Sequence, residues 1–129
     1  MGKIKLYHFS NRDFKGYILP KFFGDNSYTS NDKKYDIPRV FFYLKDEPIE
    51  KRFKYSQYKY IAEIDKHLLY DLREDKGKLL QKFRINDTVN INDLLTYLKQ
   101  NYQGAIYNVG FDIAILFYPI EYKAKENLR

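Results

Sequence analysis

The sequence contains no cysteine and no tryptophan, and it has one methionine and two histidines. The lack of cysteine excludes disulfides and thiolate metal ligands. His8 and His67 lie far apart, so the chain also lacks the two histidines at helical spacing that are typical of zinc hydrolases. We therefore expect no metal site and a fold that depends on packing rather than on covalent or metal cross-links.

Long apolar runs and phosphate-binding loops are missing as well. The longest apolar stretch, residues 111–120, contains Asp112 and is too short to cross a bilayer. Residues 1–6 become polar too early for a signal peptide. The chain carries no glycine-rich phosphate loop and no Gly-x-Ser-x-Gly turn. We therefore expect a cytoplasmic protein without membrane contact that is neither a nucleotide kinase nor a Rossmann enzyme.

The chain is rich in aromatic and charged residues. Its 129 residues suit one domain, residues 1–129. Aromatic residues make up 19%, with 14 tyrosines whose hydroxyls need water or a partner in a core. The formal net charge is +6, but acidic residues are interleaved with the basic ones. This pattern favours a lysine-covered surface, while attraction of nucleic acid or an anionic ligand stays open.

Alternating apolar and polar residues indicate that strands dominate. This pattern, with many aromatic and β-branched residues, predicts strands over 3–9, 39–44, 58–64, 104–108 and 113–118. The leucines of residues 68–83 fit one or two short helices. Asn92 as N-cap, followed by Leu94, Leu95 and Leu98, predicts a helix over 92–102. Because no regular βαβ alternation is present, we expect an α+β fold.

Four residues could carry chemistry, and each also has a structural interpretation. His8, in the first strand with Ser10 nearby, could bond a ribose or phosphate, although position alone favours a half-buried histidine bonded to backbone. Tyr43 could stack on a flat ring or simply pack in the core. Asp112 could face a cleft or water. Glu121, beyond the last strand, is expected to face solvent.

Several segments together resemble the ADP-ribosyltransferase superfamily in order and spacing. The first, Leu6-Tyr7-His8-Phe9-Ser10, resembles the Tyr-His-x-Ser/Thr first strand of the diphtheria-toxin-like branch. The others resemble strands and a turn of small bacterial and phage members: residues 60–65 (YIAEID), 69–72 (LYDL) with Asp75, 104–107 (GAIY) and 115–119 (ILFYP).

This resemblance implies a split, mostly antiparallel β-sheet with few helices that grips NAD in a cleft. His8 would then bond the adenosine ribose, with Ser10 beside it, and Tyr43, or alternatively Tyr28, would stack on nicotinamide. The family's late glutamate, which stabilises the oxocarbenium-like transition state, is absent from residues 113–117. Asp112 is the nearest carboxylate and is therefore the expected catalytic residue.

Three functions follow as hypotheses. The first is an NAD-dependent ADP-ribosyltransferase that acts on a macromolecular target, a protein in the first instance, as a toxin or phage effector. The second is a catalytically inactive binding or inhibitor protein of the same fold, favoured by the missing glutamate and the basic charge. The third is a nucleic-acid binder that uses surface lysine and tyrosine, which ranks last because no nucleic-acid module is recognisable.

Overall fold

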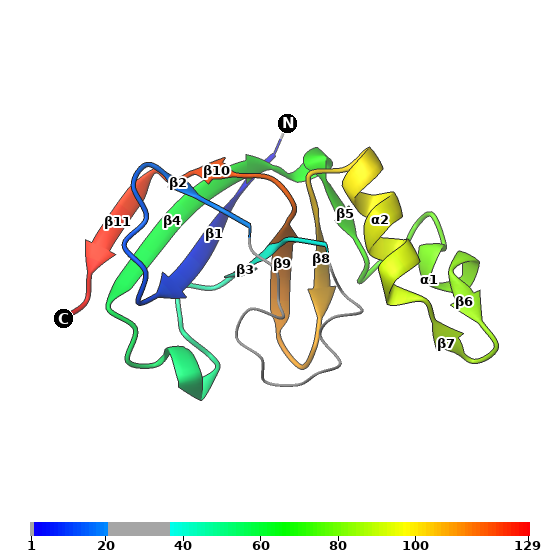
Figure 1. Cartoon of the computed structure of the whole chain (residues 1–129), viewed down its shortest axis with the longest axis horizontal. Helices are drawn as coiled ribbons and strands as arrows, with labels where there is room; N and C mark the ends of the chain where they lie inside the picture. Colours follow the sequence, from blue (N-terminus) through cyan, green and yellow to red (C-terminus); the bar gives the residue numbers. More distant parts are fainter. Residues whose placement is uncertain (1, 21–36) are drawn as a thin grey trace.

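A seven-stranded sheet forms the centre of the molecule, in the order β11-β4-β1-β3-β9-β8-β5 (Figure 1). It is seen in a computed structural model that describes residues 2–20 and 37–129. The strands are β1 (Lys3–Ser10), β3 (Val40–Tyr43), β4 (Tyr58–Asp65), β5 (Leu69–Asp71), β8 (Gly104–Asn108), β9 (Asp112–Leu116) and β11 (Ala124–Asn127). All neighbouring strands are antiparallel except β5 and β8, which are parallel. The sheet is therefore mixed, although mostly antiparallel.

Short elements complete the described part of the chain. They are β2 (Tyr17–Ile18) paired with β10 (Ile120–Glu121), the hairpin β6 (Arg84–Ile85) and β7 (Thr88–Val89), the helices α1 (Leu79–Lys82) and α2 (Ile91–Asn101), and the 3₁₀ turns η3 (Lys51–Phe53) and η4 (Lys66–Leu68). The hairpin lies beyond α1 and α2 at the right-hand end of the molecule in Figure 1. The expected strand-dominated α+β class is confirmed, and the expected strands correspond to β1, β3, β4, β8 and β9.

Helix α2 is the longest helix in the described residues and matches the predicted helix over 92–102 within one residue at each end. The predicted cap, Asn92, is wrong, because the N-cap is Asn90, whose side chain accepts a hydrogen bond from the Asp93 amide at 3.1 Å. Asn92 already lies inside the first turn, where its own side chain cannot cap. The helix buries the predicted leucines Leu94, Leu95 and Leu98.

Residues 68–83, for which one or two short helices are expected, form one short helix and one strand. Strand β5 pairs in parallel with β8, Leu69 opposite Gly104 and Asp71 opposite Ile106. The helix α1 follows a turn in which Lys78 adopts positive φ. The leucine spacing fits both structures, and the pairing with a distant strand decides in favour of β5.

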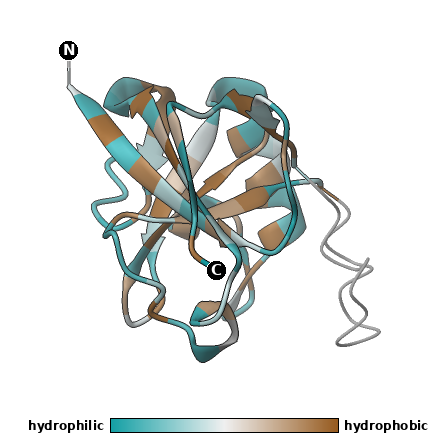
Figure 2. Ribbon diagram, turned by 90° about the vertical axis from the view of Figure 1, so that its left-hand side faces the viewer, coloured by the Kyte–Doolittle hydropathy of each residue, from teal (hydrophilic) through white to brown (hydrophobic). Residues whose placement is uncertain are grey.

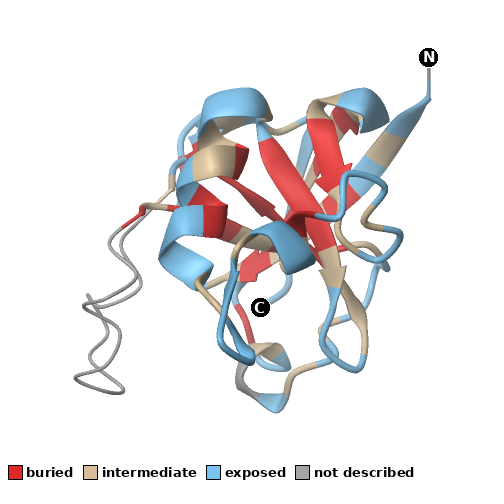
Figure 3. Cartoon of the chain, turned by 90° about the vertical axis from the view of Figure 1, so that its right-hand side faces the viewer, coloured by how far each residue is buried: buried red, intermediate tan, exposed pale blue. Residues whose placement is uncertain are grey.

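The two faces of the sheet carry separate cores. One face, which we call the His8 face, holds Leu6, Phe14, Ile18, Val40, Phe42, Tyr60, Ile64, Leu69, Ile106, Ala114 and Leu116. The opposite face, the α2 face, packs Ile37, Tyr70, Leu79, Ala105, Ile115 and Phe117 against the leucines of α2, and a third cluster of Phe9, Tyr43 and Ile113 lies further along it. Figure 2 shows hydrophobic and hydrophilic residues alternating along strands, and Figure 3 shows buried residues concentrated on the central strands, while exposed residues cover the loops and parts of the helices.

The sheet narrows sharply between β1 and β3. Strand β1 pairs with β4 along its whole length, from Lys3 opposite Asp65 to Ser10 opposite Tyr58. In contrast, among the described residues β1 joins β3 through one register pair, Tyr7 with Tyr43. The strands thus fall into two parts, β11-β4-β1 and β3-β9-β8-β5, which meet at this narrow junction.

Candidate functional site

His8 lies at the junction between the two parts of the sheet. Its Nδ1 atom is 2.7 Å from the carbonyl oxygen of Phe41 on β3. A carbonyl can only accept, so Nδ1 carries the proton, and in the neutral ring Nε2 is then the acceptor nitrogen. The half-buried ring contacts the rings of Phe42, Phe14 and Tyr60, with centroids 5.3, 5.9 and 6.2 Å away. The hydrogen bond from His8 to a backbone group, which the position of His8 in the sequence favours, is therefore present, and it joins β1 to β3 across the junction.

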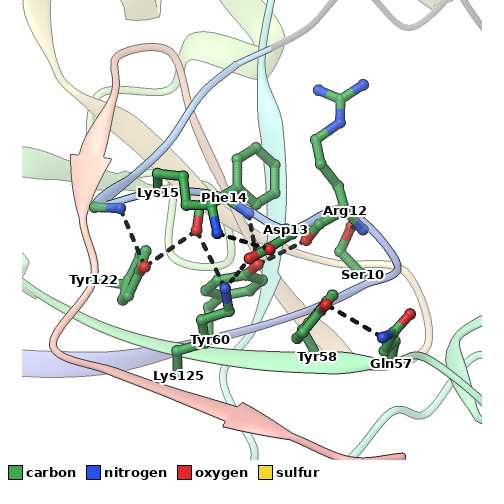
Figure 4. Close-up of polar contacts among 11 residues, drawn as sticks. Ser10, Arg12, Asp13, Phe14, Lys15, Gln57, Tyr58, Tyr60, Tyr122 and Lys125 are labelled. Carbon is green, nitrogen blue, oxygen red and sulfur yellow. Dashed lines mark hydrogen bonds and ion pairs between the residues drawn. The ribbon is translucent and has the colours of Figure 1, made fainter.

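Tyrosine hydroxyls form hydrogen bonds with the backbone of residues 12–16, the segment that follows β1 on the His8 face (Figure 4). The Tyr60 hydroxyl donates to the Arg12 carbonyl at 2.6 Å and accepts from the Phe14 amide at 2.8 Å. The Tyr122 hydroxyl donates to the Phe14 carbonyl and accepts from the Gly16 amide, both at 3.1 Å. Burial raises the pKa of the Tyr60 phenol. These hydroxyls fix the segment in place, which satisfies the need of buried tyrosines for partners.

Charged groups strengthen the same attachment. Lys125 on β11 forms an ion pair with Asp13, and Lys15 contacts the other carboxylate oxygen at 2.9 Å. The hydrogen bond from Lys125, followed by that from Lys15, lowers the pKa of Asp13. The Lys125 ammonium also lies 4.7 Å from the centroid of the Tyr58 ring. The C-terminal strand therefore helps to hold the segment that packs beside His8.

Ser10 is the last residue of β1 and shares the His8 face, because it lies two positions from His8 along the strand. Its hydroxyl oxygen accepts a hydrogen bond from the Arg12 amide at 3.0 Å. The structure therefore brings Ser10 and His8 together as the sequence predicts, and it gives the serine a local role in the turn after the strand.

Tyr43 lies on the opposite face of the sheet from His8. It is the cross-strand partner of Tyr7, and neighbouring positions along a strand point to opposite faces. The Tyr43 hydroxyl donates to Glu50 Oε1 at 2.9 Å and accepts from the Glu50 amide at 3.3 Å. Tyr43 is 5% exposed, and its ring packs against Phe9 and Phe111, with centroids 6.0 and 5.8 Å away. The structure therefore does not bring Tyr43 and His8 to one site.

Polar side chains that the sequence does not connect lie on the α2 face, where Glu50 bonds Tyr43 and both Glu50 and Arg39 act on Tyr107. Arg39 is 7% exposed, and its Nη1 donates to the Ile37 carbonyl at 2.9 Å. Burial raises the pKa of Tyr107 to about 12, with smaller opposing effects of Arg39 and Glu50. These residues come from three separate segments, so no local pattern in the sequence could connect them.

Asp112 opens β9 on the His8 face and is held by neighbouring side chains. Its Oδ2 atom is 3.1 Å from Nη1 of Arg73, and its Oδ1 accepts from the Asn108 amide group at 2.9 Å. Arg73 also binds Asp71, with Nε to Oδ1 at 2.9 Å and Nη2 to Oδ2 at 2.8 Å. These bonds raise the pKa of Arg73 and lower that of Asp71. Asp112 is thus part of an ion cluster, and β3 separates its strand from that of His8.

An open groove of about 270 Å³ lies near this cluster. Its lining residues are Ile4, Lys5, Leu44, Lys66, Arg73 and Ile106. Lys5 and Ile4 belong to β1, whereas Leu44 directly follows β3 and Ile106 lies in β8, in the other part of the sheet. The groove therefore opens where β1 and β3 diverge, and its described lining does not include His8, Ser10, Tyr43 or Asp112.

The remaining expectations concern residues elsewhere. Glu121, in β10, is exposed as expected, and Tyr28 lies outside the described residues. Within residues 2–20 and 37–129, no three metal-ligating side chains come close enough to hold an ion. In the same ranges, no helix has the length and apolar character that a membrane crossing requires. No protein-family model, curated protein or solved structure matches this chain significantly.

Proposed function

We propose that the protein is an NAD-dependent ADP-ribosyltransferase, with a split sheet of the kind that this superfamily uses, acting on a macromolecular target as a toxin or phage effector. The observation that carries the proposal is the position of His8. It lies at the one-pair junction of the sheet, and its proton on Nδ1 is directed to the Phe41 carbonyl. In this tautomer Nε2 is the ring nitrogen with acceptor character, which is the character that the proposed contact of His8 with a ribose hydroxyl requires.

The chemistry requires a carboxylate near the ribose. Breaking the bond between nicotinamide and ribose develops positive charge on the sugar, and a fixed carboxylate stabilises that charge most where water is excluded. Asp112 is the carboxylate that we assign to this role. It shares the His8 face, but the cation of Arg73 lies 3.1 Å away. Arg73 therefore offsets part of the negative charge of Asp112 that would stabilise the transition state.

A second candidate function follows from that ion pair. If Asp112 serves to hold Arg73, the protein is a catalytically inactive member of the same fold that binds its target, for example as an inhibitor. The position of Tyr43 on the opposite face from His8 also favours this alternative. Both candidates share the ADP-ribosyltransferase-like fold and differ in whether NAD is consumed.

Measuring NAD binding and NAD consumption by the purified protein tests both candidates. We expect His8→Phe, which keeps a ring in the cluster, to weaken NAD binding about tenfold through loss of one hydrogen bond. We expect Asp112→Asn to lower turnover far more than it weakens NAD binding, because its interaction is made mainly in the transition state. Asp87→Asn, in the exposed turn between β6 and β7, is the matched control for the loss of one carboxylate.

Each outcome separates the candidates. Turnover that survives in Asp112→Asn removes this residue from the catalytic role. Binding of NAD without consumption favours the inactive protein. If the unmodified protein neither binds nor consumes NAD, the transferase proposal fails.

A further inference from the structure

The groove between the two parts of the sheet combines positive charge with an apolar floor. We propose that it binds a small phosphate monoester whose organic part is apolar or flat. Three basic residues, Lys5, Lys66 and Arg73, line it, Lys5 from the face of β1 opposite to that of Ile4, and no acidic residue is among its described lining residues. The aliphatic residues of the lining are Ile4, Leu44 and Ile106.

The two lysines bring positive charge to the groove, although the ammonium of Lys66 is close enough to Asp71 to help lower the pKa of that carboxylate. Lys66 begins η4, where its backbone amide donates to the Gly2 carbonyl at 2.8 Å and so fixes the start of the side chain. Glu63 is the cross-strand partner of Lys5. Even so, neither lysine forms an ion pair within the described part of the chain. Both residues are exposed, so an anion can reach them from solvent.

Arg73 provides a rigid hydrogen-bond donor. Its Nε and Nη2 atoms bind Asp71, and its Nη1 atom binds Asp112. A guanidinium has five N–H donors, so these three contacts leave two for a ligand. Because the carboxylates already hold the side chain in place, binding loses little rotamer freedom. Asp71 and Asp112 together carry one negative charge more than Arg73 balances, so with the two lysines these five groups have a net charge of +1, which still favours an anion such as a phosphate monoester.

The size of the groove limits the ligand. Its volume of about 270 Å³ falls just below the range of about 300–1,000 Å³ for drug-sized ligands. A mononucleotide is of drug-like size, so the open groove covers part of it and leaves the rest in solvent, with the flat base against the aliphatic floor. The inference does not rest on the NAD proposal, because none of the residues assigned to NAD lines the groove and NAD carries no phosphate monoester.

Titration with adenosine monophosphate, adenosine and inorganic phosphate tests the inference, with calorimetry for affinity and the methyl resonances of Ile4, Leu44 and Ile106 for location. We expect the monophosphate to bind more tightly than either fragment and to shift these methyl resonances. We expect the double variant Lys5→Gln with Lys66→Gln to weaken this binding by at least about tenfold, since hydrogen bonds to charged groups are the stronger ones. Lys123→Gln, an exposed lysine outside the groove, is the control and should bind as the unmodified protein does.

Three results would overturn the inference. These are no binding of the monophosphate, equal affinity for adenosine and the monophosphate, and undiminished binding by the double variant. Equal weakening by Lys123→Gln would also overturn it, because this result would show attraction to the overall positive charge rather than to the groove. The unfolding midpoint of each variant is measured in parallel, and both lysines are exposed, so we expect these midpoints to stay unchanged.

Discussion

At the residue scale, the Tyr70 hydroxyl holds the turn between β5 and α1 in place through hydrogen bonds. Its hydroxyl donates to Asp75 and accepts from the Gly77 amide at 2.9 Å. Asp75 in turn accepts from the amides of Leu79 and Leu80, at 2.8 and 3.1 Å. Replacing this hydroxyl by hydrogen leaves the amide of Gly77 and the carboxylate of Asp75 without this partner. We expect Tyr70→Phe to lower the free energy of unfolding by about 1–3 kcal/mol in urea titrations.

Tyr17→Phe is the matched control, because Tyr17 is 51% exposed and its hydroxyl makes no hydrogen bond in the described residues.

A second prediction concerns the stability of the protein at alkaline pH. Burial, with help from Asp75, raises the pKa of Tyr70 to about 12 from its usual value of 10.0. A raised folded-state pKa stabilises the fold below pH 10, and this contribution is lost as pH rises from about 10 to 12. The difference in the free energy of unfolding between the wild type and Tyr70→Phe should therefore shrink as the pH rises across this interval. A constant difference would contradict the stabilising role that we assign to the Tyr70 hydroxyl.

At the scale of the elements, Gly104 allows three strands to approach at one point. It begins β8, and an added Cβ would lie 2.7 Å from Leu116 Cδ2 on β9 and 3.0 Å from Leu69 Cδ2 on β5. The Ile115 carbonyl oxygen would be closer still. A backbone atom cannot move aside as a side chain can, so the strands would have to separate.

We expect Gly104→Ala to lower the free energy of unfolding by about 3 kcal/mol, the upper part of the usual range for an overpacked core. Thermal or urea unfolding measures the loss. Gly2→Ala, where an added Cβ meets nothing within 4 Å, should change stability by less than about 0.5 kcal/mol. Equal effects of the two substitutions would mean that β5 and β9 do not enclose Gly104.

The strands were predictable where side chains alternate, because a half-buried strand imposes that pattern on the sequence itself. The strand β5 at Leu69 could not be predicted in this way, because its leucine spacing also fits a helix. Its pairing with β8 determines that the segment is a strand. Asn90 and Asn92 are equally good caps by residue type, and only the start of α2 distinguishes them.

The candidate site was harder to predict than the fold. His8 and Ser10 share a face through the period of one strand, which the sequence shows directly. The face on which Tyr43 lies depends on its register with Tyr7, a contact between distant segments. The ion pair between Asp112 and Arg73 likewise joins segments that have no pattern in common. Local patterns therefore predict which residues share an element, whereas the relation between elements comes from the folded chain.

At the scale of the whole molecule, the narrow junction raises the question of whether the two parts of the sheet unfold separately. Their backbones meet at Tyr7 and Tyr43, but their side chains share one core on the His8 face. Leu6 of β1, which is 0% exposed, belongs to the same buried cluster as Phe42 of β3 and Ile106 of β8. Because apolar packing contributes more to stability than one strand pairing does, we infer that the parts unfold as one unit.

Leu6→Ala tests this inference, because it removes buried side-chain volume from one part of the sheet only. We expect a loss of about 2–5 kcal/mol in the free energy of unfolding, the usual cost of a leucine deleted from a core. Native-state hydrogen exchange then reports how that loss is distributed. If the shared core couples the parts, the slowest amides of β4 and of β8 should lose protection by the same free energy. If β4 alone loses protection while β8 keeps it, the parts unfold independently, and the junction is a hinge between two bodies rather than a narrow point within one cooperative sheet.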